Sequence, residues 1–207
     1  MQKIITKNQV GIGILEQEQV THYGKLKIMN KVVFIILIFL LIGCGKSLFK
    51  NDELSLEKMD YFGDELKISG YFYYKYPVDN TNHYAILFLY NNGVVLHALT
   101  IKEEYLETRE EEFKTGEFYS DIKNTIYCWG VYRVDENIFK FEKWYTSSGG
   151  PLKTYVREGT ILNDTTFHIT KSYRNQKGEK TEVRPKDEIY HFKKFSPKPD
   201  STNKYTD

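Results

Sequence analysis

The side chains that most often perform chemistry in proteins form few recognisable patterns in this chain. Its five histidines are His22, His83, His97, His168 and His191. None stands in the His-Glu-x-x-His spacing that brings two ring nitrogens to one zinc ion. Residues 146–150 come nearest to the Gly-x-Ser-x-Gly motif of hydrolases but do not match it. We therefore expect no metal, no cofactor and no catalytic residue, and we interpret the last four histidines as structural.

The two cysteines stand in different surroundings. Cys128 lies in an apolar segment, and we interpret it as a small core residue rather than a reactive or metal-binding thiol. Cys44 follows eleven unbroken apolar residues, 32–42, and Lys31 precedes them. A positive residue, a short apolar run and a small residue are the parts of a signal peptide. A membrane-spanning helix would need about 20 apolar residues. A short buried strand is the alternative interpretation.

Leu41, Ile42, Gly43 and Cys44 resemble the lipobox of bacterial lipoproteins. This resemblance implies lipidation of the Cys44 sulfur by a diacylglyceryl group, cleavage after Gly43 and acylation of the new amino terminus with a chain such as palmitate. Three acyl chains suffice for stable attachment to a membrane. Residue 45 is not the Asp that retains enterobacterial lipoproteins in the inner membrane. The resemblance therefore points to the outer membrane of the cell envelope, with an ordinary signal peptide as the alternative.

The same signals divide the chain into segments. Residues 1–28 are polar and lack periodicity, so we expect Met29 to be the true start, the alternative being a long cytoplasmic extension. We expect the signal peptide at 29–43, the lipidated cysteine and a tether at 44–58, one β-barrel-like domain at 59–195 and a disordered polar tail at 196–207.

Charge argues against one class of partner. The formal net charge of the full chain is +1, and acidic and basic residues are interspersed. A nucleic-acid-binding domain would usually carry a strongly basic face. We therefore expect no nucleic-acid partner, and attachment to a membrane would have to come from the lipid on Cys44.

From residue 66 onward, short aromatic and β-branched segments alternate with turn residues. The alternation predicts strands at 66–76, 83–90, 94–99, 126–134, 138–145, 152–157, 159–162, 166–173 and 188–195. The spacing of apolar residues between 102 and 120 predicts one short helix with an acidic face. We therefore predict a mainly β fold, an antiparallel meander of about eight or nine strands that forms a small barrel or a sandwich.

Two segments, 129–134 and 137–142, are similar to the aromatic-rich hairpins of small lipocalin-like bacterial lipoproteins. The whole layout, including 90–95 and 190–195, resembles uncharacterised envelope lipoproteins. Typical lipocalins carry Gly-x-Trp near the first strand, where this chain has Gly70, Tyr71 and Phe72. The resemblance implies a lipocalin-like β-meander.

Aromatic residues are abundant, with 17 Tyr, 13 Phe and two Trp. They can line a ligand pocket or simply pack across strands. Our candidate ligand-binding residues are Tyr71, Tyr73, Trp129, Tyr132 and Trp144. Space beside the face of Ile126, Cys128, Gly130 and Tyr132 would favour a pocket, and filling by Phe72 and Phe88 would oppose one.

We predict a membrane-anchored envelope lipoprotein that is not an enzyme and that binds a small apolar ligand or a partner protein. One alternative is a structural or interaction lipoprotein with a filled core. A hydrolase that uses carboxylates distant in sequence is the weaker alternative.

Overall fold

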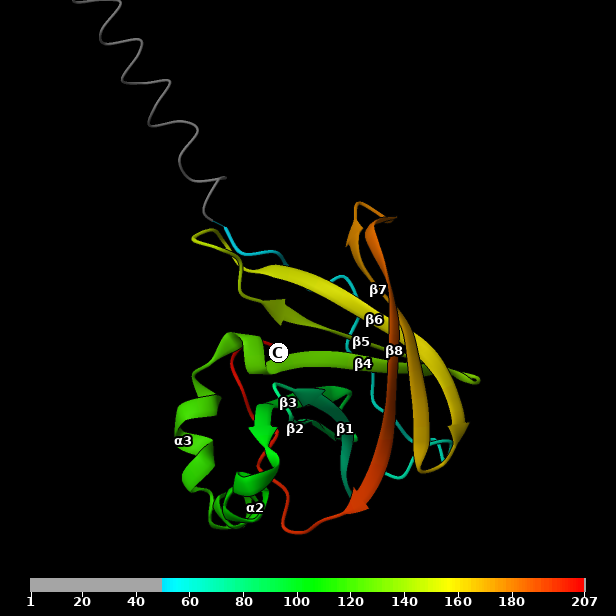
Figure 1. Cartoon of the computed structure of the whole chain (residues 1–207). Coiled ribbons are helices and arrows are strands. Elements are labelled where there is room, and N and C mark those ends of the chain that lie inside the picture. The colour runs from blue at the N-terminus through cyan, green and yellow to red at the C-terminus, as the bar shows by residue number, and fades with distance from the viewer. Residues whose placement is uncertain (1–49, 207) are drawn as a thin grey trace, which may run out of the picture. The chain divides into compact units, whose positions relative to one another are not determined.

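The fold is a closed antiparallel barrel in which each strand pairs with the next and β8 returns to β1 (Figure 1). The computed structural model describes residues 50–206, and the side chains of all of these except 119–121. The strands are β1 (Gly70–Val78), β2 (Thr81–Leu89), β3 (Val94–Lys102), β4 (Trp129–Asp135), β5 (Ile138–Tyr145), β6 (Lys153–Asn163), β7 (Thr166–Gln176) and β8 (Glu179–Lys194). The predicted mainly β fold class is confirmed, and the closed sheet makes it a barrel.

Alternate residues of each strand face the barrel interior. The register places Phe72 opposite Leu87 and Phe167 opposite Tyr190, so large apolar side chains meet inside the barrel. Residues from β1 to β5 and from β7 and β8, with two from the segment before β1, form this inner cluster: Tyr61, Leu66, Phe72, Leu87, Leu89, Val95, Tyr132, Phe139, Phe141, Phe167, Ile169 and Tyr190.

A second cluster lies on the outside of β1 to β4, beneath the helices that follow β3 (Figure 1). These are η1 (Glu103–Tyr105), α2 (Leu106–Thr115), α3 (Glu117–Lys123) and η2 (Ile126–Cys128). Phe113 of α2 packs edge-on against Phe88 of β2, with ring centroids 5.2 Å apart. The predicted helix is present, and Gly116, with a left-handed φ of 80°, ends α2 before α3 begins.

Three predicted segments differ from the structure. Residues 126–128 form a 3-10 turn rather than the start of a strand, and β4 begins only at Trp129. The predicted strands 152–157 and 159–162 are one strand, β6. Residues 174–187, expected as a polar turn, mostly extend β7 and β8 into a long hairpin, because a two-residue turn at Lys177 and Gly178, both with positive φ, suffices to reverse the chain.

The segment before β1 is bound to the barrel where a tether was expected. Glu142 on the outer face of β5 accepts hydrogen bonds from the backbone N–H groups of Ser55 and Leu56, at 2.6 and 2.7 Å. The backbone N–H of Asp52 also donates to the carbonyl of Leu152, at 2.9 Å. These hydrogen bonds fix the backbone of residues 52–56 on the barrel, so this segment does not form a free linker.

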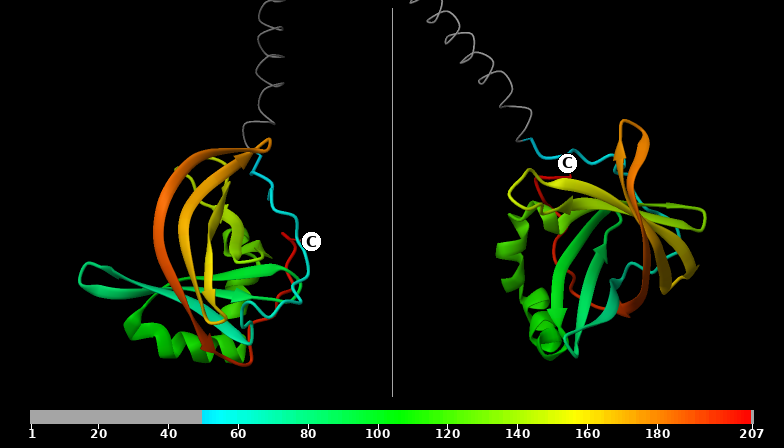
Figure 2. Two further views of the ribbon diagram at one scale, coloured as in Figure 1. Left: turned by 90° about the vertical axis from the view of Figure 1, so that its right-hand side faces the viewer. Right: turned by 45° about the horizontal axis from the view of Figure 1, so that its top comes forward.

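The polar C-terminal segment also packs on the barrel, so the expectation of a disordered tail is wrong for residues 197–206. Tyr90 donates a hydrogen bond to the carbonyl of Pro199 at 2.8 Å, and Lys198 donates to the carbonyls of Ile68 and Leu89 at 2.7 and 2.8 Å. Figure 2 shows this segment (red) beside the N-terminal segment (cyan). Polar residues order here because they satisfy backbone carbonyls at a strand end, which a hydropathy pattern does not reveal.

Both hydrophobic clusters lie within the barrel unit, and residues 51–207 form a compact unit of their own. We therefore expect the chain from residue 45 to fold without the preceding residues. None of the helices described is long and apolar enough to cross a membrane. The predicted signal peptide, Gly43 and Cys44 lie outside the described residues.

Candidate ligand-binding cavity in the barrel

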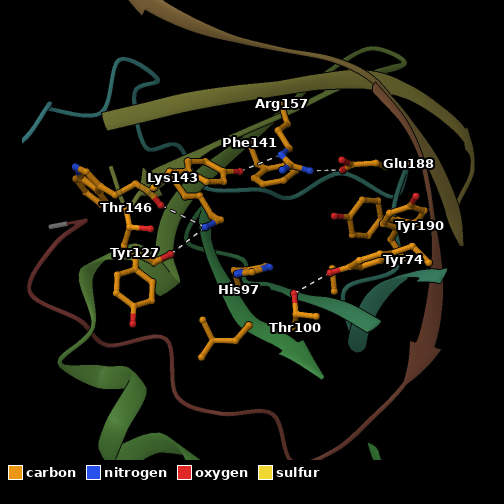
Figure 3. Close-up of a pocket in the computed structure, with 15 residues that line it drawn as sticks. Tyr74, His97, Thr100, Tyr127, Phe141, Lys143, Thr146, Arg157, Glu188 and Tyr190 are labelled. Atoms are coloured by element: carbon orange, nitrogen blue, oxygen red, sulfur yellow. Dashed lines mark hydrogen bonds and ion pairs between the residues drawn. The ribbon is translucent and has the colours of Figure 1, made fainter. Parts of the chain in front are cut away.

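The barrel interior is divided along its axis into a filled half and an open half. The filled half lies where β1 begins and β2 ends. The open half holds a cavity of about 610 Å³ (Figure 3). The residues that line it come from six strands, from η2 and from the loop after β5: Tyr74, Tyr76, Ala85, His97, Leu99, Thr100, Tyr127, Phe141, Lys143, Trp144, Tyr145, Thr146, Arg157, Glu188 and Tyr190.

The cavity exists because β3 and β4 separate. They pair over only three positions, ending with Leu96 opposite Trp129, because η2 precedes β4 and cannot continue the ladder. Beyond this point β3 carries one extra residue relative to β2, since Ala85 pairs with Thr100 but Leu87 pairs with His97. Leu99, in this bulge, has a left-handed φ of 62°. The bulge directs consecutive residues of β3 to the mouth of the cavity.

Gly130 allows β4 and β5 to approach closely beside the cavity. A side chain at this position would place its Cβ 2.1 Å from the carbonyl oxygen of Glu142 and 2.8 Å from the Cβ of Lys143. Gly130 pairs directly with Lys143 across β4 and β5. Only glycine permits this approach of the two strands beside Lys143.

Aromatic rings form much of the cavity wall. Tyr74 stacks on Tyr76 with ring centroids 5.2 Å apart, and Tyr74 lies 5.7 Å from Tyr190. The hydroxyl groups of Tyr76 and Thr100 are hydrogen-bonded at 3.0 Å near the mouth. Such a wall offers apolar area together with a few polar groups, as small-molecule sites usually do.

One ion pair spans the cavity wall between β6 and β8. The guanidinium of Arg157 binds the carboxylate of Glu188 and donates to the Tyr145 hydroxyl at 2.9 Å. Burial alone would lower the pKa of Arg157, but the neighbouring Tyr145, Tyr190 and Glu188 raise it above its ordinary value. Lys186 also lies 3.4 Å from Glu188. The negative charge of Glu188 is thus already matched by cations.

Lys143 is the second cation of the cavity, and no carboxylate among the described side chains forms an ion pair with it. Its side chain is buried, with 5% of the residue exposed. The ammonium group donates to the carbonyls of Tyr127 and Trp144, at 3.0 and 3.3 Å, and lies 4.0 Å from the centroid of the Tyr145 ring (Figure 3). Among the described side chains, which exclude residues 119–121, no carboxylate oxygen lies within 4.0 Å of it. Burial, and secondarily the charge of Arg157, lowers the pKa of Lys143 to about 7.

His97 lines the cavity close to these two cations. Its Nδ1 is buried and has no hydrogen-bond partner among the described residues. Burial, with the charges of Lys143 and Arg157, lowers the pKa of His97 well below 6.5. The imidazole is therefore neutral at pH 7 and adds no positive charge to the cavity.

The structure distributes the five predicted ligand-binding residues over three places. Tyr71, Tyr73 and Trp129 belong to or pack against the outer cluster, so they face away from the interior. Tyr132 lies in the filled half, where its hydroxyl donates to the carbonyl of Tyr90 at 2.9 Å. Of the five, Trp144 alone is among the residues that line the cavity, and its indole N–H donates to the carbonyl of Asp52 at 2.6 Å.

The predicted face of residues 126–132 is also divided. Tyr132 is inside the barrel, whereas Cys128 is in the outer cluster, where burial raises the pKa of its thiol to about 11. Phe72 fills the interior, but Phe88 faces the helices outside. The barrel is therefore filled at one end and open at the other.

Sequence reasoning missed Lys143, although a signal was present. Lys143 lies two residues from both Phe141 and Tyr145, so the alternation of β5 places a charged residue on its apolar face. Tyr74 and Tyr76 share the alternating face of Phe72, which is the inner one. A charged residue on an apolar strand face would therefore have located the cavity better than the abundance of aromatic residues did.

The described residues contain no group of three His, Cys, Asp or Glu side chains that could hold a metal ion. Comparisons with protein-family models, curated proteins and solved structures find no match to this chain. The barrel topology is compatible with a lipocalin-like fold, but a fold does not specify a function, which has to be argued from the cavity.

Proposed function

We propose that this protein is a lipid-anchored binding protein of the bacterial cell envelope that holds a small, largely apolar molecule in the open half of its barrel. The observation that carries this proposal is the cavity of about 610 Å³. Small-molecule sites typically have volumes of about 300–1,000 Å³ and mostly apolar walls with a few polar groups. A protein that worked only through its outer surface would have no need for this space.

The construction of the cavity supports the same proposal. A β-bulge with a left-handed leucine, a glycine at a close strand approach and a shortened β3–β4 ladder all weaken the sheet where the cavity lies. Backbone in sparsely populated conformations costs about 1–3 kcal/mol per residue and gathers at functional sites. The alternative of an interaction protein with a filled core does not account for these features.

The anchoring part of the proposal rests on the sequence around Cys44. Its resemblance to a lipobox supports lipidation at Cys44, cleavage after Gly43 and a place in the envelope, the outer membrane rather than the inner in a bacterium with two membranes. Replacing Cys44 with Ser would then release the protein from the membrane fraction. Unchanged fractionation of that variant would contradict the anchor and leave the cavity proposal intact.

The binding proposal is tested with the uncharged fluorophore N-phenyl-1-naphthylamine and the chain from residue 45 to 207. We expect saturable fluorescence enhancement with one molecule bound per barrel. Leu99→Trp, at the cavity mouth, should weaken binding by about tenfold or more by occupying the space.

The matched control is Leu162→Trp, which introduces the same ring at another exposed leucine that does not line the cavity. It should leave the affinity unchanged. Equal effects of the two substitutions would place the fluorophore elsewhere and contradict the proposed site.

A further inference from the structure

We infer that the natural ligand of this cavity is a small monoanion with an apolar body, such as a carboxylic acid, and that its charge is bound by the ammonium group of Lys143. This inference rests on the proposed function, because it names the chemical class of the ligand. It follows from the charges, the donors and the walls of the cavity.

The charges of the cavity do not balance. Lys143, Arg157 and Glu188 are the charged side chains that line it. Arg157 and Glu188 bind each other, and Lys186 adds a further cation at Glu188. The charge of Lys143 is therefore left over. A buried ammonium without a counter-ion is costly, and a bound anion would remove that cost.

The position of Lys143 is suited to bind such an anion. An ammonium group has three N–H donors. The carbonyls of Tyr127 and Trp144 accept two of them and fix the nitrogen at the cavity wall, while the Tyr145 ring lies beside it (Figure 3). No oxygen of residues 50–206 accepts the third. This donor can form a charge-assisted hydrogen bond with a ligand, which is about twice as strong as a neutral one.

A cationic ligand would find no equivalent partner. Glu188 is the one carboxylate among the lining residues, and it is already bound to Arg157. An anion with more than one charge would also be poorly matched, because Lys143 is the one surplus cation among the lining residues. The rings of Tyr74, Tyr76 and Tyr190 favour an apolar remainder of the ligand.

The test compares acids with their neutral counterparts, using displacement of N-phenyl-1-naphthylamine from residues 45–207. Decanoate is paired with decan-1-ol, and 2-naphthoate with 2-naphthol. Decylamine serves as the cation. We expect at least one acid to bind about tenfold to hundredfold more tightly than its alcohol. The better acid would show whether the apolar body is aliphatic, as in a lipid-derived acid, or aromatic.

Lys143→Met removes the charge and keeps the length of the side chain. It should abolish the preference for the acid while binding of the alcohol persists. Lys140→Met is the matched control, since Lys140 lies on the same strand but on the outer face, near Asp135. It should preserve the preference. Circular dichroism checks that both variants fold, and the comparison of acid with alcohol in the unaltered protein does not depend on either.

The outcomes separate this inference from the proposed function. Equal binding of acids and alcohols, or tighter binding of decylamine, would overturn the inference and leave an apolar binding site standing. An absence of binding by the fluorophore and by all five compounds would overturn the proposed function itself.

Discussion

The two halves of the barrel interior share β1, β2, β3, β5 and β8, but one half is packed with apolar side chains and the other encloses a cavity. In the filled half, Phe139 and Phe167 pack with ring centroids 4.3 Å apart, and both side chains are fully buried. In the open half, Lys143 on β5, Arg157 on β6 and Glu188 on β8 border the cavity where the filled half has packed apolar rings. The filled half has the packing expected of a stabilising core, and the open half has the charge and space expected of a binding site.

The largest effect that distinguishes the halves should come from truncating their aromatic rings. Phe167→Ala in the filled half should lower the free energy of unfolding by about 3–5 kcal/mol, because it leaves a cavity in close-packed surroundings. Tyr76→Ala in the open half should cost about 1 kcal/mol or less, since its ring already borders space and solvent. Urea denaturation measures both. Similar losses would contradict the division of the barrel.

A smaller effect should come from the buried cation of the open half. Lys143→Met should raise the free energy of unfolding of the ligand-free protein by about 2–4 kcal/mol near pH 6. Folding lowers the pKa of Lys143 from 10.5 to about 7. Between these values the unfolded chain binds more protons than the folded one, so the stability of the unaltered protein rises with pH through this window. The advantage of the variant should therefore shrink toward pH 10.5.

The groups around Lys143 do not reproduce this pH dependence. Burial lowers the pKa of His97, on β3, so its own rise of stability with pH ends by about pH 7.5 and is common to both proteins, while burial raises the pKa of Cys128 to about 11. The pKa values of Tyr145 and Arg157 are both raised. Urea denaturation from pH 6 to pH 10 measures the effect, and an advantage of the variant that stays constant across this range would show that Lys143 is not the titrating group.

The smallest effect concerns the C-terminal segment that covers the outside of the barrel. Tyr90→Phe removes the hydrogen bond to the carbonyl of Pro199 and should cost about 1 kcal/mol, because both groups are buried. Tyr76→Phe removes an exposed hydrogen bond at the cavity mouth and should cost less than about 0.5 kcal/mol. Thermal unfolding compares them. Equal costs would mean that the hydrogen bond between Tyr90 and Pro199 stabilises the fold no more than the exposed one does.

The alternation of polar and apolar residues predicted the strands well where one face of the strand is buried and the other is exposed to solvent. The predicted strand 138–145 coincides with β5, and the predicted face of Phe72, Tyr74 and Tyr76 is the inner one. The same pattern did not reveal that β3 and β4 would separate. The 3-10 turn at Ile126–Cys128 and the bulge at Leu99 depend on how β3 and β4 fit around the helices, which is a property of the closed barrel.

The cavity, too, was predictable only in its local features and not in its position. Its aromatic character was predictable from composition, but four of the five candidates lie elsewhere and Trp144 borders the cavity from the outer face of β5, because abundance does not say which face is enclosed. The order of residues 197–206 was also missed, since backbone carbonyls rather than apolar side chains hold that segment. A lysine on an apolar strand face, Lys143, was the local signal that pointed to the site.

The central claim is that the open half of the barrel binds a small monoanion with an apolar body. The most direct measurement is native mass spectrometry of residues 45–207 purified from a bacterial envelope, recorded before and after denaturation and after incubation with decanoate or 2-naphthoate. We predict one bound acid per barrel that is lost on denaturation and is absent from Leu99→Trp. An unliganded mass under every condition would contradict the claim.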